Sequence, residues 1–202
     1  MYLCTCLLLN MKASAAILLG GQNSRMSGRN KAFVKFGSCS VIEHMMLVLS
    51  PLFDDILFIS NTDHEQYSSF ENVRIISDII PVKGALAGIH TSVASSVHEH
   101  CLVLACDLPL IDGAYIKNLF QKVSESHYAV VPLHSEGIEP LHAFYSKKLL
   151  PALEYYLLQE QSLKITSFLN KIPVRYFYTE NTPIFANINS PEDLHFYSAY
   201  TK

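Results

Sequence analysis

Short runs of apolar residues alternate along the chain with segments in which apolar residues recur at helical spacing. The runs predict strands at residues 13–20, 55–60, 73–77, 101–106, 128–132, 141–145 and 174–178. The helical spacing predicts helices at residues 41–49, 84–97, 112–123, 147–158, 163–169 and 190–197. Runs that are continuous rather than alternating are typical of strands covered on both faces. We therefore expect an α/β fold, with a mostly parallel sheet and helices on both faces.

The pattern predicts one domain over residues 13–202, because no repeat, low-complexity segment or linker interrupts it. Residues 1–12 are predicted to be an N-terminal extension outside the fold, and a loosely docked tail is the alternative. The apolar run at residues 1–9 is too short to span a bilayer, which takes about 20 apolar residues. It also lacks the basic segment and cleavage site of a signal peptide.

Composition narrows the class of protein further. The chain has 202 residues, of which 50% are hydrophobic and 16% charged, and this balance excludes a disordered protein. A net charge of −3 argues against a nucleic-acid-binding protein, and we expect neither nucleic acid nor membrane as a partner. Five scattered cysteines do not form a disulfide framework, so a reducing, cytoplasmic setting is expected.

The charge is unevenly distributed along the chain. Residues 1–42 carry five basic and no acidic side chains, a local charge of +5. The remaining 10 basic and 18 acidic side chains give −8, so the two parts sum to the total of −3. The basic residues gather around a glycine loop at residues 20–31, directly after the first predicted strand. This distribution is expected of a protein that binds one small polyphosphate.

Two features at the carboxyl ends of predicted strands, where such sheets bind ligands, carry candidate chemistry. Gly20 and Gly21 allow the backbone amides to approach a phosphate, although neither a P-loop nor a dinucleotide fingerprint is present. An ordinary strand-to-helix loop is the alternative. Asp107 ends the strand at 101–106, where a carboxylate is costly unless it is paired or binds a metal. A magnesium ion suits it, and an N-terminal helix cap is the alternative, although Asp112 is available for that.

The segment Leu-Leu-Gly-Gly-Gln-Asn-Ser-Arg-Met-Ser-Gly-Arg-Asn-Lys at residues 18–31 resembles the signature of nucleotidyltransferases with a three-layer Rossmann-like fold. Within that group it is most similar to the molybdenum cofactor guanylyltransferases. The residues in register are Gly20, Gly21, Arg25, Met26 and Lys31. The departures from the signature are Leu19, Asn23 and Ser27. Further segments are similar in the same order, namely residues 81–88, 106–109, 139–142 and 187–194.

The resemblance implies a set of site residues. Those implied to bind the nucleotide are Leu18, Leu19, Gly20, Gly21, Lys31, Asn61 (or its neighbour Ser60), Asp78, Gly88 and Asp107. Those implied to act in catalysis are Arg25, Lys31 and Asp107, with Asp107 also the metal ligand. Those implied for the pterin side are His142, Asn187 and Asn189. For Gly88, tight packing of a helix is the competing explanation.

The activity that the resemblance implies is transfer of GMP from GTP to molybdenum-molybdopterin, which yields molybdopterin guanine dinucleotide and pyrophosphate. The implied cofactor is Mg²⁺. The implied partners are GTP, the molybdenum cofactor, proteins that handle this cofactor, and apo-molybdoenzymes. A related enzyme that uses CTP or a sugar- or alditol-phosphate acceptor is one alternative. A nucleotide- or cofactor-binding module without catalysis is the other.

Overall fold

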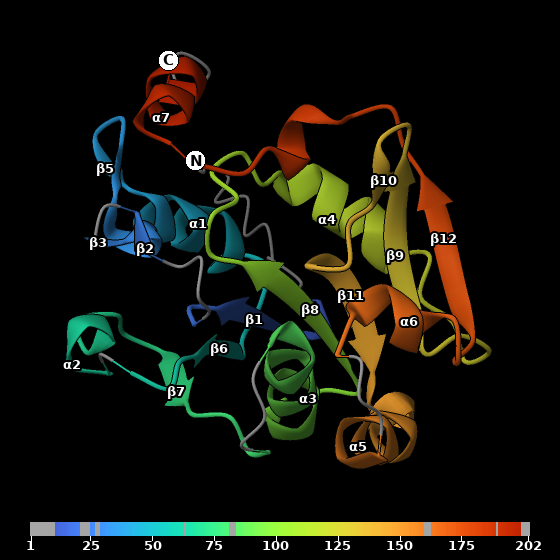
Figure 1. Cartoon of the computed structure of the whole chain (residues 1–202). Helices are drawn as coiled ribbons and strands as arrows, with labels where there is room; N and C mark the ends of the chain where they lie inside the picture. Colours follow the sequence, from blue (N-terminus) through green and yellow to red (C-terminus); the bar gives the residue numbers. More distant parts are fainter. Residues whose placement is uncertain are drawn as a thin grey trace, which may run out of the picture.

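One mixed sheet forms the centre of the molecule in the computed structural model, which describes residues 11–20, 25–26, 29–62, 64–80, 84–159, 163–188 and 190–198. The eight-stranded sheet has the order β10-β9-β11-β8-β1-β6-β7, and β12 pairs with β9 (Figure 1). Its strands are β1 (Ser14–Leu18), β6 (Ile56–Ile59), β7 (Val73–Ile76), β8 (His100–Ala105), β9 (Ala129–His134), β10 (Gly137–Ile138), β11 (His142–Ser146) and β12 (Val174–Tyr178).

The order of the strands reverses beside β1. From β1 the chain runs outward to β6 and β7, then returns through a helix to β8 on the other side of β1. The pairs β1·β6, β6·β7 and β1·β8 are parallel, whereas β11 runs antiparallel to both β8 and β9. The carboxyl ends of β1 and β8 therefore flank a switch point, which is where ligands bind in sheets of this kind.

Helices cover both faces of the sheet and enclose two cores (Figure 1). The helices are α1 (Val41–Leu49), α2 (His64–Tyr67), α3 (Ala85–Ser95), α4 (Gly113–Phe120), α5 (Leu150–Gln159), α6 (Ile165–Leu169) and α7 (Pro191–Ser198). Alternate residues of β1 enter different cores: Ile17 packs with α1 and α4, and Ala16 packs with α3 and α5. This alternation follows from the two-residue period of a strand and confirms the predicted fold class.

The longer elements confirm the predictions from the sequence. The helix at 41–49 and the strand at 174–178 have the predicted bounds, whereas the helix predicted at 147–158 divides into a 3-10 turn (Lys147–Leu149) and α5. Sequence periodicity missed α2, β10 and two small hairpins, β2–β3 (Arg25–Met26 with Arg29–Asn30) and β4–β5 (Lys35–Phe36 with Cys39–Ser40). A strand of two residues is too short to show any period.

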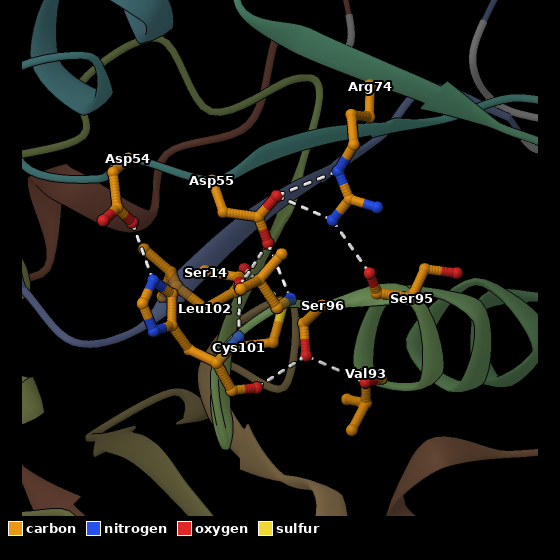
Figure 2. Close-up of polar contacts among 11 residues, drawn as sticks. Ser14, Asp54, Asp55, Arg74, Val93, Ser95, Ser96, Cys101 and Leu102 are labelled. Carbon is orange, nitrogen blue, oxygen red and sulfur yellow. Dashed lines mark hydrogen bonds and ion pairs between the residues drawn. The ribbon is translucent and has the colours of Figure 1, made fainter.

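A cluster of polar groups joins the opposite, amino-terminal edge of the same sheet (Figure 2). The carboxylate of Asp55, before β6, accepts hydrogen bonds from Ser14 Oγ, from the guanidinium of Arg74 and from the backbone N–H of Val97. Arg74 also donates to the carbonyl of Ser95 at the end of α3. This amino-edge cluster of Ser14, Asp55, Arg74, Ser95 and Val97 connects three strands to the carboxyl end of α3.

The start of the described chain corrects one boundary. Met11, which the sequence assigns to an extension, is buried in the core and donates its backbone N–H to the carbonyl of Leu52 at 2.9 Å. The fold therefore includes Met11, because apolar packing and a backbone pairing hold it there. Residues 1–10 lie outside the described residues, and their assignment stays a prediction. Among the described residues, no helix has the length and apolar character needed to cross a membrane.

Candidate active site

The switch point brings together two residues that lie 76 positions apart in the sequence. Lys31 Nζ lies 3.5 Å from Asp107 Oδ2, and their side chains are 6% and 20% exposed. The register of β1 with β8 explains this contact. Leu18 pairs with Ala105, so these two parallel strands end side by side, at the edge of the sheet where Lys31 and Asp107 lie. The sequence predicted both residues for the site, and the fold places their charged groups in contact.

Asp107 is available for binding because a different carboxylate caps the next helix. Asp112 Oδ1 accepts from the backbone N–H groups of Ala114 and Tyr115 at 2.7 and 3.3 Å, as the sequence predicted. The backbone carbonyl of Asp107 accepts from Ile188 N at 2.9 Å. The C-terminal segment therefore holds the backbone of Asp107, while its carboxylate stays partly exposed beside Lys31.

The glycine loop begins in open space at the end of β1. A Cβ built on Gly20 has no heavy atom within 4 Å, so the backbone there is accessible to a ligand. Gly21 lies outside the described residues, and Arg25 lies in β2, whose register pairs it with Asn30. Lys31 follows at the start of a 3-10 turn (Lys31–Phe33) and is buried.

Leu18 and Leu19 point to opposite faces of the sheet. Leu19 is 2% exposed in the core beneath α1, and Leu18 is 7% exposed in the core beneath α3. Gly88 lies on α3 against Leu18: a Cβ there would approach both terminal methyl carbons of Leu18 to 3.1 Å. The packing explanation for Gly88 therefore has direct support, and the nucleotide-binding roles of all three residues stay predictions.

Asn61 and Asp78 form a reciprocal pair at the ends of β6 and β7. Asn61 Nδ2 donates to Asp78 Oδ2 at 2.7 Å, and Asp78 N donates to Asn61 Oδ1 at 2.8 Å. Ser60, the alternative to Asn61, is buried, and its hydroxyl bonds to the backbone of Thr62. Of the two, Asn61 is the one exposed to solvent at this edge.

The residues predicted for the pterin side are not brought together in the same way. His142 is fully buried at the start of β11, in edge-to-face contact with Tyr115 and Phe185. Burial lowers the pKa of His142 to about 3, so the ring is neutral, and neither ring nitrogen has a partner among the described residues. Asn187 is exposed, whereas Asn189 lies outside the described residues. Their roles stay predictions.

Sequence reasoning explained the residues after Asn189 correctly. Ser190 Oγ accepts from Asp193 N, and the Asp193 carboxylate accepts from Ser190 N, which makes a capping box at the start of the helix predicted at 190–197. Sequence reasoning missed two residues that contact the predicted site residues: Ile188, whose N–H donates to the carbonyl of Asp107, and Thr91 on α3, whose hydroxyl donates to Asp78. Thr91 lies three positions after Gly88 and thus on the same helix face, but a buried threonine carries no signal of function on its own.

The chemistry available at this edge is electrostatic. A buried cation and a partly exposed carboxylate suit a polyphosphate and a hard metal ion. Burial raises the pKa of the neighbouring Cys106 thiol to about 12, so this thiol is not a nucleophile at neutral pH. The site is therefore suited to positioning and charge neutralisation rather than to covalent catalysis.

Comparison with known proteins places this geometry in a family. Residues 15–174 match the model of the MobA-like NTP transferase domain. A probable molybdenum cofactor guanylyltransferase of Clostridium perfringens is 33% identical over 192 residues, 95% of this chain and 93% of that protein. A molybdenum cofactor guanylyltransferase of Desulfosudis oleivorans is 32% identical over 88% of this chain and 90% of its own length.

Solved structures agree with the family match. Molybdopterin-guanine dinucleotide biosynthesis protein A of Archaeoglobus fulgidus superposes with a TM-score of 0.78 at 27% identity, over 93% of this chain and 98% of that one. The 4-diphosphocytidyl-2C-methyl-D-erythritol synthase of Anaerococcus prevotii shares the fold at 17% identity, with a TM-score of 0.69 over 94% and 95% of the two chains. The chain belongs to the MobA-like NTP transferase family and is a nucleotidyltransferase.

Proposed function

We propose that this enzyme transfers GMP from GTP to molybdenum-molybdopterin, yielding molybdopterin guanine dinucleotide and pyrophosphate. The observation that carries the proposal is the Lys31–Asp107 pair at the switch point, 3.5 Å apart and at the end of the glycine loop. The names of the relatives support GTP and the molybdenum cofactor as substrates.

In the proposed step, a terminal phosphate oxygen of molybdopterin attacks the α-phosphorus of GTP. One P–O bond forms to the attacking oxygen, and the bond from the α-phosphorus to the bridging oxygen of the β-phosphate breaks, releasing pyrophosphate. A phosphate is already ionised near pH 7, so no general base is needed. The enzyme must instead overcome repulsion between two anions, a task that suits Lys31 and, from β2, Arg25.

The residues fit a magnesium ion. Magnesium usually takes one or two carboxylates and completes its shell with water and substrate phosphates. Asp107 supplies one partly exposed carboxylate at this position. When bound, Mg²⁺ would neutralise charge on the phosphate oxygens. We therefore propose Asp107 as the metal ligand and Lys31 as the residue that holds the carboxylate and the phosphates together.

The remaining predictions complete the proposal. Asn187, Asn189 and His142 are proposed for the pterin side, where Ile188 already connects the C-terminal segment to Asp107. Proteins that handle the molybdenum cofactor and apo-molybdoenzymes are the proposed protein partners. Among the described residues the cysteines are free, consistent with the proposed reducing, cytoplasmic setting.

The test is pyrophosphate release by the purified full-length chain, supplied with Mg²⁺, molybdenum-molybdopterin and GTP, CTP, UTP or ATP in turn. Release of pyrophosphate with GTP, and with none of the other three nucleotides, supports the proposal. Release with CTP, or with a sugar- or alditol-phosphate acceptor, would replace it with a sister activity. Binding of GTP without turnover in the presence of the acceptor would instead indicate a binding module.

A further inference from the structure

We propose that Thr91, on α3, is a positioning residue for Asp78. It holds the Asp78 carboxylate in the orientation in which Asp78 meets the nucleotide. This inference rests on the proposed function, and it takes Asp78 to be the nucleotide contact that the family resemblance implies. It assigns a role to a residue of α3, an element that contributes neither to the glycine loop nor to the Lys31–Asp107 pair.

The Thr91 hydroxyl bridges two groups of the loop after β7. Its Oγ1 accepts from the backbone N–H of Ile79 at 3.0 Å and donates to Asp78 Oδ1 at 3.4 Å. Thr91 itself is fully buried, whereas Asp78 is half-buried and Ile79 is 54% exposed. A buried hydroxyl thus reaches outward to fix both the backbone and the side chain of a loop at the site edge.

Asp78 is held from two elements at once. Asn61, after β6, donates to Asp78 Oδ2, and Thr91 donates to Asp78 Oδ1. A carboxylate has about four acceptor positions, so the donors among the described residues leave about two for a ligand. These remaining positions of the Asp78 carboxylate can only accept hydrogen bonds. They therefore favour a ligand group that donates, such as a sugar hydroxyl or a base N–H. The two protein donors leave the carboxylate little rotational freedom before the ligand arrives.

Helix α3 gives Thr91 a fixed origin. One turn earlier, Gly88 packs against Leu18 of β1, and the missing side chain permits that close approach. At its carboxyl end, the carbonyl of Ser95 accepts from Arg74 in the amino-edge cluster (Figure 2). The helix is therefore held to the sheet on both sides of Thr91, and a group supported in this way can preorganise a binding residue.

The variants are Thr91→Val, which keeps the shape and removes the hydroxyl, and Thr91→Ser, which keeps the hydroxyl. The matched control is Ser92→Ala, which removes a neighbouring buried hydroxyl that bonds to the Gly88 carbonyl and has no contact with Asp78. For each full-length variant the measurements are KM and kcat for GTP in pyrophosphate release, GTP affinity by calorimetry, and the unfolding temperature.

Thr91→Val is expected to raise KM and Kd for GTP about tenfold, the effect of losing one hydrogen bond to a charged group, with kcat within about twofold. Thr91→Ser and Ser92→Ala are expected to keep both constants within about twofold. In the background of Asp78→Ala, Thr91→Val should add little, because the residue that it positions is absent.

An unchanged GTP affinity in folded Thr91→Val overturns the inference. So does an equal loss in Thr91→Ser, or in Ser92→Ala, because the effect then follows packing rather than the hydroxyl. Failure of the proposed function is a separate result: the wild type would use another nucleotide, and the Thr91 comparison would be made with that one. If the wild type bound none of the four nucleotides, both proposals would be overturned.

Discussion

Two carboxylates lie at opposite edges of the same sheet, in contrasting surroundings. Asp55, at the amino edge, is 8% exposed and accepts from Ser14, from two nitrogens of Arg74 and from Val97 N. Asp107, at the carboxyl edge, is 20% exposed on its side chain, and within the described part of the chain its carboxylate contacts Lys31 at 3.5 Å.

The difference between the two carboxylates separates a structural use of a buried polar group from a use in ligand binding. At the amino edge the acceptors of Asp55 are used by the protein, so the cluster stabilises the sheet and has little capacity for a ligand. At the carboxyl edge Asp107 keeps acceptor capacity that the described part of the protein does not use. Groups of that kind lower stability and are retained where a ligand completes them.

The largest effect is expected from Asp107→Ala. Removing this carboxylate should abolish magnesium-dependent pyrophosphate release, a loss of at least about 10²-fold, because the charge that we propose holds the metal, and that pairs with Lys31, is gone. The unfolding free energy should change less than in Asp55→Ala. Full activity in Asp107→Ala would contradict its assignment as metal ligand.

The second effect is expected from Asp55→Ala, which should lower the unfolding free energy by on the order of 2–3 kcal/mol. The variant leaves the buried Ser14 hydroxyl without its acceptor, at a cost of about 1–3 kcal/mol, and it removes the acceptor of the partly buried N–H of Val97, which adds less. Arg74 is 45% exposed and can be hydrated, which limits the loss. Urea denaturation measures it, and kcat of the folded variant at low temperature should match the wild type. If Asp55→Ala lost activity while its stability stayed unchanged, Asp55 would serve function rather than stability, contrary to the comparison between the two edges.

The third prediction concerns acid. Burial alone raises the pKa of Asp55, but the hydrogen bonds from Ser14, Val97 N and Arg74 outweigh it, so the pKa lies below its ordinary value. A lowered pKa adds stability that is present above the unfolded-state value of about 3.9 and is lost as pH falls through the folded-state value. The difference in unfolding free energy between wild type and Asp55→Asn should therefore shrink below about pH 4. If the difference in unfolding free energy stayed constant from pH 7 to pH 3, the charge of Asp55 would not be the source of its contribution to stability.

The smallest effect is expected from Gly88→Ala. The new methyl would lie 3.1 Å from two carbons of Leu18, so α3 or Leu18 must shift slightly, at a cost of about 1 kcal/mol. Thermal unfolding measures the cost, and the double variant with Leu18→Val should recover part of it. If the single variant keeps its stability but loses GTP affinity, Gly88 acts on the nucleotide and not on packing.

Much of the fold could be predicted because its signals are local. The helix at 41–49 has apolar residues at helical spacing and a Ser40–Glu43 capping box, so its bounds match the structure. The β2–β3 and β4–β5 hairpins could not be found, since their two-residue strands are defined by pairing across a turn.

The candidate site was predictable only in part. Lys31 and Asp107 carry charges beside glycines and at a strand end, which the sequence displays. Thr91 carries no such signal, because its proposed role depends on the loop after β7 lying next to its hydroxyl in the folded chain. His142 was predicted for the pterin side, and its full burial between Tyr115 and Phe185 could not be deduced from one histidine in a strand.

By itself, the sequence determined the alternation of strands and helices, the cationic loop at residues 20–31 and the acidic residue after β8, since these depend on spacing and on residue type. The tertiary structure decided which of these features meet. The strand order placed β1 beside β8 and so brought Lys31 to Asp107, while α3 brought Thr91 to Asp78. Contacts between distant segments are set by sheet order and helix packing, and no local pattern encodes them.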